Sequence, residues 1–399
     1  MTREVDVVAV GGGLGGAAVA KVMAARGARV LVVEPERRFR DRVRGEYLVP
    51  WGGCEAQALG LADALVAAGA HETPWLDLLA GGLPFSHRDL RPMTPQGAAP
   101  ACFQHAAMQE AVLEAAQASG ADVWRGARVR GLSAGPTVVV ERDGQEESVR
   151  ARLVVGADGR ASAVRRWAGF ESRAAPEDRF FCGVLLDGVE TPDDTSLMVT
   201  SPGQGRMSYV FPQGGGRARI YFGWHKALGL GRMSGAKDLP RFVAECVTTG
   251  AAPAWFAGAQ AAGPLATFDA HDSWVDHPYR DGVALIGDAA STSDPHWGQG
   301  MSHTLRDARL LGEALAASDD WTAAGHAYAA AHDRTCEVTR RSESWMATVL
   351  MEVGPEADRI RARALPLLAE DAERFPAYGF SGPDGDVDDD VRKRFLGET

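Results

Sequence analysis

The sequence from Glu4 to Glu34 reads EVDVVAVGGGLGGAAVAKVMAARGARVLVVE. Residues 4–10 form an apolar run of strand length, residues 14–26 are rich in alanine and favour a helix, and residues 28–34 form a second apolar run. A buried strand, a helix and a second buried strand in this order make a βαβ unit. The chain is therefore predicted to have an α/β fold built on a parallel sheet.

The turn between the first strand and the helix carries the pattern G-x-G-x-x-G, with Gly11, Gly13, Leu14 and Gly16. In such a turn the first glycine allows the tight bend, the second lets the backbone approach a pyrophosphate, and the third allows close packing of the helix. Glu34 ends the second strand, where a carboxylate accepts hydrogen bonds from a ribose diol. The pattern predicts a dinucleotide site, for NAD or FAD; a tight turn without a ligand is the alternative.

Two further motifs follow later in the chain. Residues 156–165 read GADGRASAVR, and GDAA at residues 287–290 is followed by PHWGQGM at residues 295–301. Together with the glycine turn, they resemble in order and approximate spacing the three fingerprints of the flavoprotein monooxygenases of the p-hydroxybenzoate hydroxylase fold. The resemblance covers the cofactor framework of nearly the whole chain. It implies FAD as the cofactor and NADPH or NADH as the electron donor.

The resemblance also implies a fold and a domain order. The expected fold is α/β, with a Rossmann-like FAD-binding domain of the glutathione reductase type, an inserted and mainly antiparallel β-sheet domain that binds substrate, and C-terminal helices. Residues 176–264 alternate short strands with turn signals and are assigned to the inserted sheet. Residues 1–175 and 265–399 are then the two parts of the FAD-binding domain. The Asp-rich segment 384–390 is predicted to be a solvated tail.

Each motif residue receives an expected role from the resemblance. Asp288 is expected to bind the ribityl hydroxyl of the flavin, and Asp158 with Gly159 to touch the pyrophosphate region and help position NAD(P)H. The alternative for both aspartates is a turn or helix-cap role. The turn from residue 295 onward is expected to form a backbone wall at one flavin edge, where side chains would obstruct close approach. Its expected cofactor contacts are Pro295, Gly298, Gly300 and Met301.

Outside these motifs, two residues match the pattern of the family and two residues differ from it. Arg44 falls where the family places an arginine near the pyrophosphate and the moving flavin, and with Pro295 and Gly298 it completes the expected catalytic set. Gln109 falls where a helix glutamine meets the ribityl chain; solvent exposure is the alternative for both. His105 stands where many relatives carry arginine, and Ser291 where many carry histidine.

Aromatic residues of the inserted segment are the candidates for the substrate wall opposite the flavin. Strand alternation places Tyr209 and Phe211 on one face together, and likewise Phe222 and Trp224. Core packing is the alternative for each. His225 is a candidate general base for a phenolic substrate; the alternative is that it has no catalytic role. The expected substrate contacts are Tyr209, Phe211, Tyr221, Phe222, Trp224 and Trp297.

The composition of the chain indicates which kinds of binding partner are unfavourable. The chain has 42 basic and 53 acidic residues and a formal net charge of −11, which disfavours binding to nucleic acid or anionic membranes. No apolar run reaches membrane-spanning length, and no signal peptide precedes the first strand. The five cysteines are dispersed without a CxxC pair, which fits a cytoplasmic protein. The spacing of His271 and His277 fits no zinc pattern, so no metal is expected.

The combined prediction is an NAD(P)H-dependent FAD monooxygenase that hydroxylates or epoxidises an aromatic or polycyclic small molecule with O2. As the resemblance implies, a flavin C4a-hydroperoxide delivers the oxygen atom. Two alternatives remain. One is an FAD-dependent reductase or dehydrogenase on the same scaffold, similar to the prenyl reductases. The other is a flavin-binding module without turnover, to which the departures at His105 and Ser291 would point.

Overall fold

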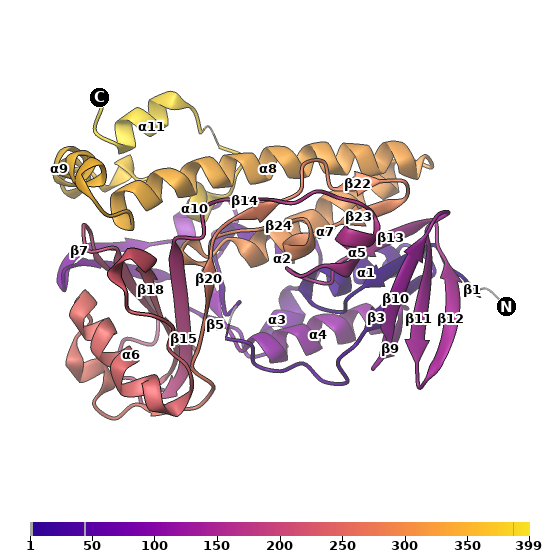
Figure 1. Ribbon diagram of the computed structural model, residues 1–399, viewed down its shortest axis with the longest axis horizontal. Coiled ribbons are helices and arrows are strands. Elements are labelled where there is room, and N and C mark those ends of the chain that lie inside the picture. Colours follow the sequence, from indigo (N-terminus) through magenta and orange to yellow (C-terminus); the bar gives the residue numbers. More distant parts are fainter. Residues whose placement is uncertain (1–2, 44, 386) are drawn as a thin grey trace.

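The computed structural model describes residues 3–43, 45–385 and 387–399. Figure 1 shows strands gathered toward both ends of the molecule, with the long helix α8 (Trp321–Leu350) running along one side of both groups. One group contains the parallel sheet that the sequence predicts. The other contains a large, mostly antiparallel sheet.

The parallel sheet is formed by strands whose residues are mostly apolar and buried on both faces. Val7 and Ala9 pack against helices, whereas Val8 and Val10 pack in a second apolar cluster on the opposite face. Continuous apolar runs are the pattern of a strand covered on both sides. In order across the sheet, the strands are β22 (Tyr279–Arg280), β23 (Val283–Leu285), β13 (Leu153–Gly156), β2 (Val7–Val10), β3 (Val30–Glu34) and β9 (Asp122–Arg125). All neighbours pair in parallel except the edge strand β22, which is antiparallel to β23.

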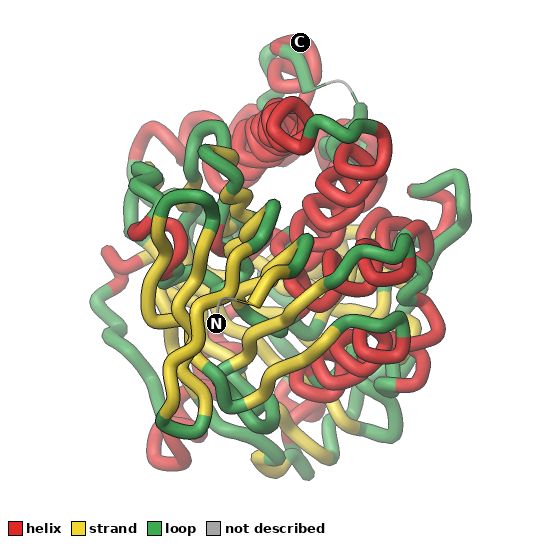
Figure 2. The backbone as a smooth tube through the Cα atoms, turned by 90° about the vertical axis from the view of Figure 1, so that its right-hand side faces the viewer, coloured by secondary structure: helices red, strands yellow, loops and turns green. Residues whose placement is uncertain are grey.

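Helices and a small, mainly antiparallel sheet cover the two faces of the parallel sheet (Figure 2). Helix α1 (Leu14–Ala25) connects β2 to β3 and packs against α4 (His105–Ala118) and α7 (Gly300–Ala317). The predicted βαβ unit is therefore present. The flanking sheet consists of β1 (Arg3–Glu4), β12 (Gln145–Arg150), β11 (Thr137–Arg142) and β10 (Arg128–Ser133).

The large sheet takes strands from three separate parts of the chain. Its order is β19 (Gln260–Ala261), β15 (Arg179–Asp187), β18 (Arg217–His225), β17 (Arg206–Pro212), β16 (Thr195–Ser201), β6 (Trp75–Ala80) and β7 (Leu83–Asp89), and β20 (Ala266–Ala270) also pairs with β15. The expected boundaries 176–264 therefore do not enclose the sheet. Strands β6 and β7 were missed because β6 pairs in parallel with β16, about 120 positions later, and local patterns carry no signal for such a pairing.

Helix α6 (Gly235–Thr249) contacts β16, β17 and β18 and covers one face of the large sheet. The opposite face is turned toward the parallel sheet and toward the C-terminal helices. The remaining elements are α2 (Pro50–Ala58), α3 (Ala62–Ala67), α5 (Ala163–Trp167), α9 (Pro355–Glu370), α10 (Tyr378–Ser381), α11 (Asp389–Phe395), β4 (Tyr47–Leu48), β5 (His71–Glu72), β8 (Ala101–Cys102), β14 (Arg173–Ala174), β21 (Ser273–Trp274) and β24 (Ser291–Thr292).

The C-terminal segment is more ordered than the sequence predicts. Asp384 accepts a 2.7 Å hydrogen bond from Nη1 of Arg306 in α7, and residues 389–395 form helix α11. The Asp384 side chain is 76% exposed, in line with the predicted solvation, but its carboxylate is also paired with Arg306. Among the described residues, no helix is both long enough and apolar enough to cross a membrane.

Candidate functional site

A cavity of about 880 Å³ lies between the parallel sheet and the large sheet, and we call it the central cavity. Residues from all three sequence motifs line it, although they are far apart in the chain. The expected cofactor residues found in its wall are Gly11, Gly13, Leu14, Glu34, Gln109, Asp158, Gly159, Asp288, Pro295, Gly298, Gly300 and Met301. Gly16 lies behind this wall. Arg44 lies outside the described residues.

The glycine turn before α1 has the geometry of a phosphate cradle. A Cβ atom on Gly11, whose φ is +99°, would lie 2.5 Å from the carbonyl oxygen of Ala157, so only glycine fits. A Cβ atom on Gly16 would lie 1.9 Å from the carbonyl oxygen of Gly11, which makes Gly16 a packing residue. Gly13 caps α1 without a side chain and lines the cavity. The backbone N–H groups of the first helical turn can therefore approach an anion.

Glu34 lies beside this turn, at the end of β3. Its two carboxylate oxygens accept hydrogen bonds from the backbone N–H groups of Gly12 (2.8 Å) and Glu36 (2.7 Å). Burial raises the pKa of the Glu34 carboxyl, although the two N–H donors partly offset this effect. Glu34 also lines the cavity, so its carboxylate is placed to accept hydrogen bonds from a ribose diol.

Asp158 lines the cavity, but its carboxylate is engaged in helix capping. It accepts hydrogen bonds from the backbone N–H groups of Ala163 (2.6 Å) and Val164 (3.1 Å) and from the hydroxyl of Ser162. These bonds satisfy the first turn of α5. The helix-cap alternative therefore describes the Asp158 side chain. Because its carboxylate is engaged in these bonds, only the backbone around Gly159 is available to contact a pyrophosphate.

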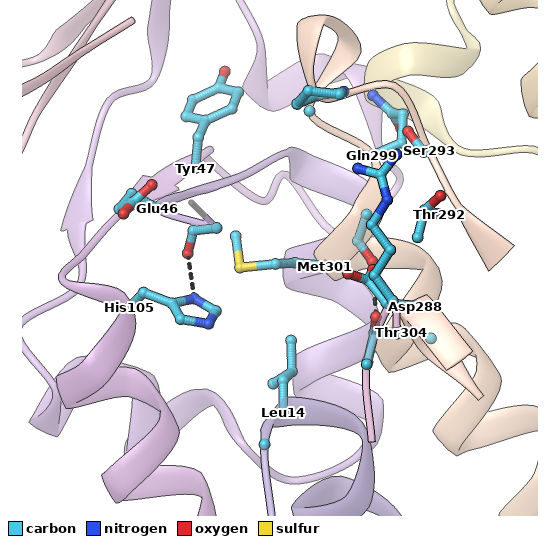
Figure 3. Close-up of a pocket in the computed structure, with 18 of the residues that line it drawn as sticks. Leu14, Glu46, Tyr47, His105, Asp288, Thr292, Ser293, Gln299, Met301 and Thr304 are labelled. Carbon is cyan, nitrogen blue, oxygen red and sulfur yellow. Dashed lines mark hydrogen bonds between the residues drawn. The ribbon is translucent and has the colours of Figure 1, made fainter. Parts of the chain in front are cut away.

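The second wall of the cavity is built around Asp288 and the N-terminus of α7. Figure 3 shows Asp288 and Thr304 on one side of the space, Glu46, Tyr47 and His105 on the other, and the Met301 side chain projecting between them. No side chain caps α7, so the positive end of its dipole is available to a ligand at Gly300 and Met301.

Buried groups hold the backbone that precedes Asp288. The Gly287 N–H donates to Oδ2 of Asp307 (2.8 Å), and Nδ1 of His332 donates to Oδ1 of the same carboxylate (2.7 Å). Burial lowers the pKa of His332, but the nearby Asp307 carboxylate outweighs it and the pKa is well above its usual range. A charged His332 therefore helps to hold Asp307, and with it the turn that carries Asp288.

The turn from Pro295 to Gly298 is anchored by a buried network. Asp294 accepts hydrogen bonds from the backbone N–H of His296 (3.0 Å) and from its Nδ1 (2.6 Å), and lies 3.1 Å from Nε of Arg179. Burial raises the pKa of Asp294, but His296 and Arg179 outweigh it and hold the pKa well below its usual range. Tyr209 donates to the carbonyl oxygen of His296 (3.0 Å). The turn is thus tied to the large sheet.

Aromatic side chains of the large sheet form the opposite wall. Tyr209, Phe211 and Tyr221 line the cavity as expected, together with Phe181 and Phe268. Tyr47 stacks on Phe211 with ring centroids 4.4 Å apart, and Phe181 stacks on Tyr221 at 4.7 Å. Trp297 also lines the cavity. The result is an apolar aromatic surface of stacked and edge-on rings, which suits an aromatic ligand.

One buried carboxylate interrupts this apolar wall. Glu46 accepts a hydrogen bond from the hydroxyl of Tyr221, and its Oε1 lies 3.2 Å from Nη2 of Arg219. Nη2 of Arg219 also donates to Oδ2 of Asp41 (2.8 Å). These bonds attach Asp41 and Glu46 to β18. Nδ1 of His105 donates to the carbonyl oxygen of Gly45 (2.9 Å), which attaches Gly45 to α4 (Figure 3).

Two predicted substrate contacts are wrong. Phe222 and Trp224 are fully buried on the other face of β18, where they pack with Phe242 of α6. Successive residues of a strand point to opposite faces, so once Tyr221 faces the cavity Phe222 cannot. Period-2 alternation grouped the residues correctly but could not say which group faced the site.

His225 is also misplaced as a general base. It ends β18, its Nδ1 accepts a hydrogen bond from the Ala227 N–H (3.2 Å), and it is not among the described residues that line the cavity. His225, Asp178 and Glu352 have atoms close enough to share a metal ion. However, Arg179 lies 3.5 Å from Asp178 and 3.0 Å from Glu352, so both carboxylates already have a cationic partner.

Several cavity residues were missed from the sequence. His296 stands inside the third motif, so its position was a signal, but its partner Asp294 gave no indication of a buried pair. Phe181, Glu46 and Arg88 carried no recognisable pattern. They reach the cavity through strand pairings and loop attachments that only the tertiary structure defines.

Comparison with known proteins agrees with this geometry. Residues 4–345 match the family model described as FAD binding domain. The chain belongs to this FAD-binding family. It is 28% identical over 393 residues to the 6-methylpretetramide 4-monooxygenase of Streptomyces rimosus, covering 94% of this chain and 90% of that protein. It is 31% identical over 224 residues to digeranylgeranylglycerophospholipid reductase 1 of Methanococcoides burtonii, covering 52% and 51%.

The solved structures resemble the whole chain. The p-nitrophenol 4-monooxygenase PnpA of Pseudomonas putida superimposes with a TM-score of 0.75 at 19% identity, covering 100% of this chain and 98% of that one. At 19% sequence identity, this similarity shows that the two chains share a fold. The expected fold class, with a Rossmann-like FAD-binding domain, a substrate sheet and C-terminal helices, is confirmed.

Proposed function

We propose that this chain is an NAD(P)H-dependent FAD monooxygenase that hydroxylates or epoxidises an aromatic or polycyclic small molecule. One observation carries the proposal: a single cavity joins the dinucleotide cradle at Gly11 and Gly13 to the aromatic wall at Tyr209 and Tyr221. A flavin held by the cradle and a planar substrate held by the wall would therefore meet in one space. The similarity to a monooxygenase over 94% of the chain supports the same reaction.

The residues present fit FAD. Gly11 and Gly16 exclude a Cβ atom, Glu34 lines the adenosine end that the fold implies, and Asp288 with the α7 N-terminus lines the other. A pyrophosphate would meet the backbone at Gly13, and Asp288 would hold the ribityl chain. Bound FAD supplies the chemistry, since it accepts a hydride from NADPH or NADH and activates dioxygen at flavin C4a.

The protein's own contribution is positioning, charge stabilisation and exclusion of water. The uncapped N-terminus of α7 places a positive dipole where a reduced flavin would gain negative charge. The Pro295–Gly298 turn presents backbone to the flavin edge and is kept rigid by Asp294 and Tyr209. The stacked pair of Tyr47 and Phe211 keeps the substrate side apolar and removes water from it.

Gly298→Val tests this assignment. Gly298 has a φ of +69°, so a β-branched residue there strains the turn, and its side chain would enter the cavity from a point 3.6 Å from Tyr47. The variant should keep FAD but release hydrogen peroxide in place of oxygenated product, because oxygen transfer needs reacting atoms held near ~3–3.5 Å. NAD(P)H oxidised, O2 consumed, product formed and peroxide released are measured with a panel of aromatic substrates.

Gly135→Val is the matched control. Gly135 also has a positive φ, +76°, but a Cβ atom on this residue would have no neighbouring atom within 4 Å, and Gly135 is not among the described residues that line the cavity. Its coupling of NAD(P)H to product should equal that of wild type. If Gly298→Val retained FAD and full coupling, the turn would not belong to the active site.

A reductase on the same scaffold is the second candidate, because 31% identity to a reductase extends over half of the chain. It would oxidise NAD(P)H and reduce substrate without dioxygen. Substrate-dependent NAD(P)H oxidation that continues under nitrogen would favour the reductase. Absence of any substrate-dependent oxidation would favour a flavin-binding module without turnover.

A further inference from the structure

The cavity face of the large sheet extends beyond its aromatic centre to the strands β6 and β7. Arg88 pairs with Leu76 across this hairpin, and Ser86 pairs with Leu78. Directly paired residues of antiparallel strands share a face of the sheet. Leu76 and Leu78 are both buried, and all four side chains line the central cavity. The far end of the aromatic wall therefore carries one arginine among apolar neighbours.

Arg88 is one of the cavity arginines that have no carboxylate partner among the described residues, and Arg128 is another. Among the described residues, no carboxylate lies within ion-pair distance of Arg88, and its guanidinium makes one weak contact, from Nη2 to Sδ of Met93 at 3.7 Å. Arg42 and Arg130 line the same cavity but are paired with Glu36 and Glu141. The Arg88 side chain is half-buried. Apart from the weak contact of Nη2 with Met93, its N–H donors are therefore available, in a partly desolvated place where an anionic partner is worth most.

The position of Arg88 also constrains the length of a ligand. Strand β17, which carries Tyr209, is separated from β7 by β16 and β6. Three strand spacings of about 4.8 Å place the two strands roughly 14 Å apart. Tyr209 holds the turn at Pro295–Gly298 through the carbonyl oxygen of His296. A molecule that reaches from this turn to Arg88 is therefore longer than a single aromatic ring.

We propose that Arg88 is a carboxylate subsite of the central cavity and selects an elongated polycyclic aromatic acid. The planar guanidinium fork would bind the carboxylate in a bidentate manner, while the rings lie along the Leu76 and Tyr209 side of the wall. Ser86, two residues away on the same face, adds one hydroxyl donor. This inference rests on the proposed function only for the claim that the bound acid is the substrate; the binding site itself stands without it.

Isothermal titration calorimetry on the FAD-loaded protein tests the subsite. The probes are anthracene-2-carboxylate and the uncharged anthracene-2-carboxamide, which match in shape. Wild type should bind the carboxylate roughly ten- to a hundredfold more tightly, the range of a charge-assisted hydrogen bond. Arg88→Gln should remove this preference and leave the amide affinity unchanged, whereas Arg88→Lys should keep part of it because the charge remains without the fork.

Arg91→Gln is the matched control. Arg91 is three residues away, but it is exposed and already paired with Asp89, so removal of its charge should leave the preference intact. The subsite is refuted if wild type shows no preference, if Arg88→Gln retains it, or if Arg91→Gln removes it equally. The titration uses neither NAD(P)H nor O2. If the carboxylate does not bind, the proposed oxygenation reaction is not refuted. If NAD(P)H oxidation is not coupled to product formation, the proposed carboxylate subsite is not refuted.

Discussion

Gly223 of β18 provides the space in which His296 sits. A Cβ atom at this position would lie 2.0 Å from Nε2 of His296 and 2.5 Å from its Cδ2. The imidazole has little freedom to move, because its Nδ1 donates to Asp294 at 2.6 Å and its ring contacts that of Phe181 at 4.8 Å. The His296 side chain is 0% exposed. Gly223→Ala must therefore displace either the ring or the strand.

The expected cost follows from these contacts. Overpacking a well-packed interior costs about 1–3 kcal/mol. If the ring moves away and its bond to Asp294 breaks, an uncompensated buried group remains, and such losses cost about 3–5 kcal/mol. We expect Gly223→Ala to lower the free energy of unfolding by about 2–5 kcal/mol. It should also weaken FAD binding, since the Pro295–Gly298 turn moves with His296.

Urea unfolding with and without FAD, together with the dissociation constant of FAD, measures both effects. Gly131→Ala is the control, because Gly131 is also a strand glycine but a Cβ atom on it would have no neighbouring atom within 4 Å. It should be neutral or stabilising by up to ~1 kcal/mol. In the double variant Gly223→Ala/His296→Ala, the methyl group gains room. Its destabilisation should fall short of the sum of the single changes by about 0.5–3 kcal/mol.

Two results would refute this reasoning. The first is a Gly223→Ala protein within about 0.5 kcal/mol of wild type, which would mean that the imidazole is not confined. The second is strict additivity in the double variant, which would mean that the methyl group and the ring do not meet.

Three further predictions concern the cofactor site and its supporting helix. Asp288→Ala should weaken FAD at least about tenfold by loss of a charge-assisted hydrogen bond; full FAD occupancy after dilution would contradict this. Gly13→Val should purify without flavin, which is measured by absorbance. A Cβ atom on residue 13 would already lie 3.1 Å from Nε2 of Gln109, so the larger valine side chain would fill the phosphate cradle. Burial in α7 lowers the pKa of His303 to about 4. As the pH falls below 6.5, the imidazole is protonated in the unfolded chain before it is protonated in the folded one. The free energy of unfolding is therefore highest above pH 6.5 and decreases as the pH falls toward 4. Relative to His303→Gln, wild type should lose about 2 kcal/mol between pH 7 and pH 5 in urea titrations, and parallel pH profiles would show that His303 is not buried uncharged.

The amino-acid sequence by itself determined the cofactor framework. The strands around Val7 and Val30, the helix after Gly13 and the turn at Pro295 are defined by local patterns, because glycine placement and apolar runs depend on backbone geometry over short distances. These elements and the cavity residues they carry lie where the motifs predict. Local patterns also grouped Tyr209 with Phe211 and Phe222 with Trp224 correctly.

Only the tertiary structure decided which groups face the cavity and what holds them there. The orientation of β18 depends on α6, which covers one of its faces. Phe222 and Trp224 therefore lie in the core beneath α6, and Tyr221 lies in the wall of the cavity. The contact of Asp294 with Arg179, beside its pair with His296, depends on the start of β15 lying next to the Pro295–Gly298 turn. Arg88 reaches the cavity because β6 pairs with a strand about 120 positions away. Such contacts arise from the packing of distant segments, and no local pattern in the chain encodes them.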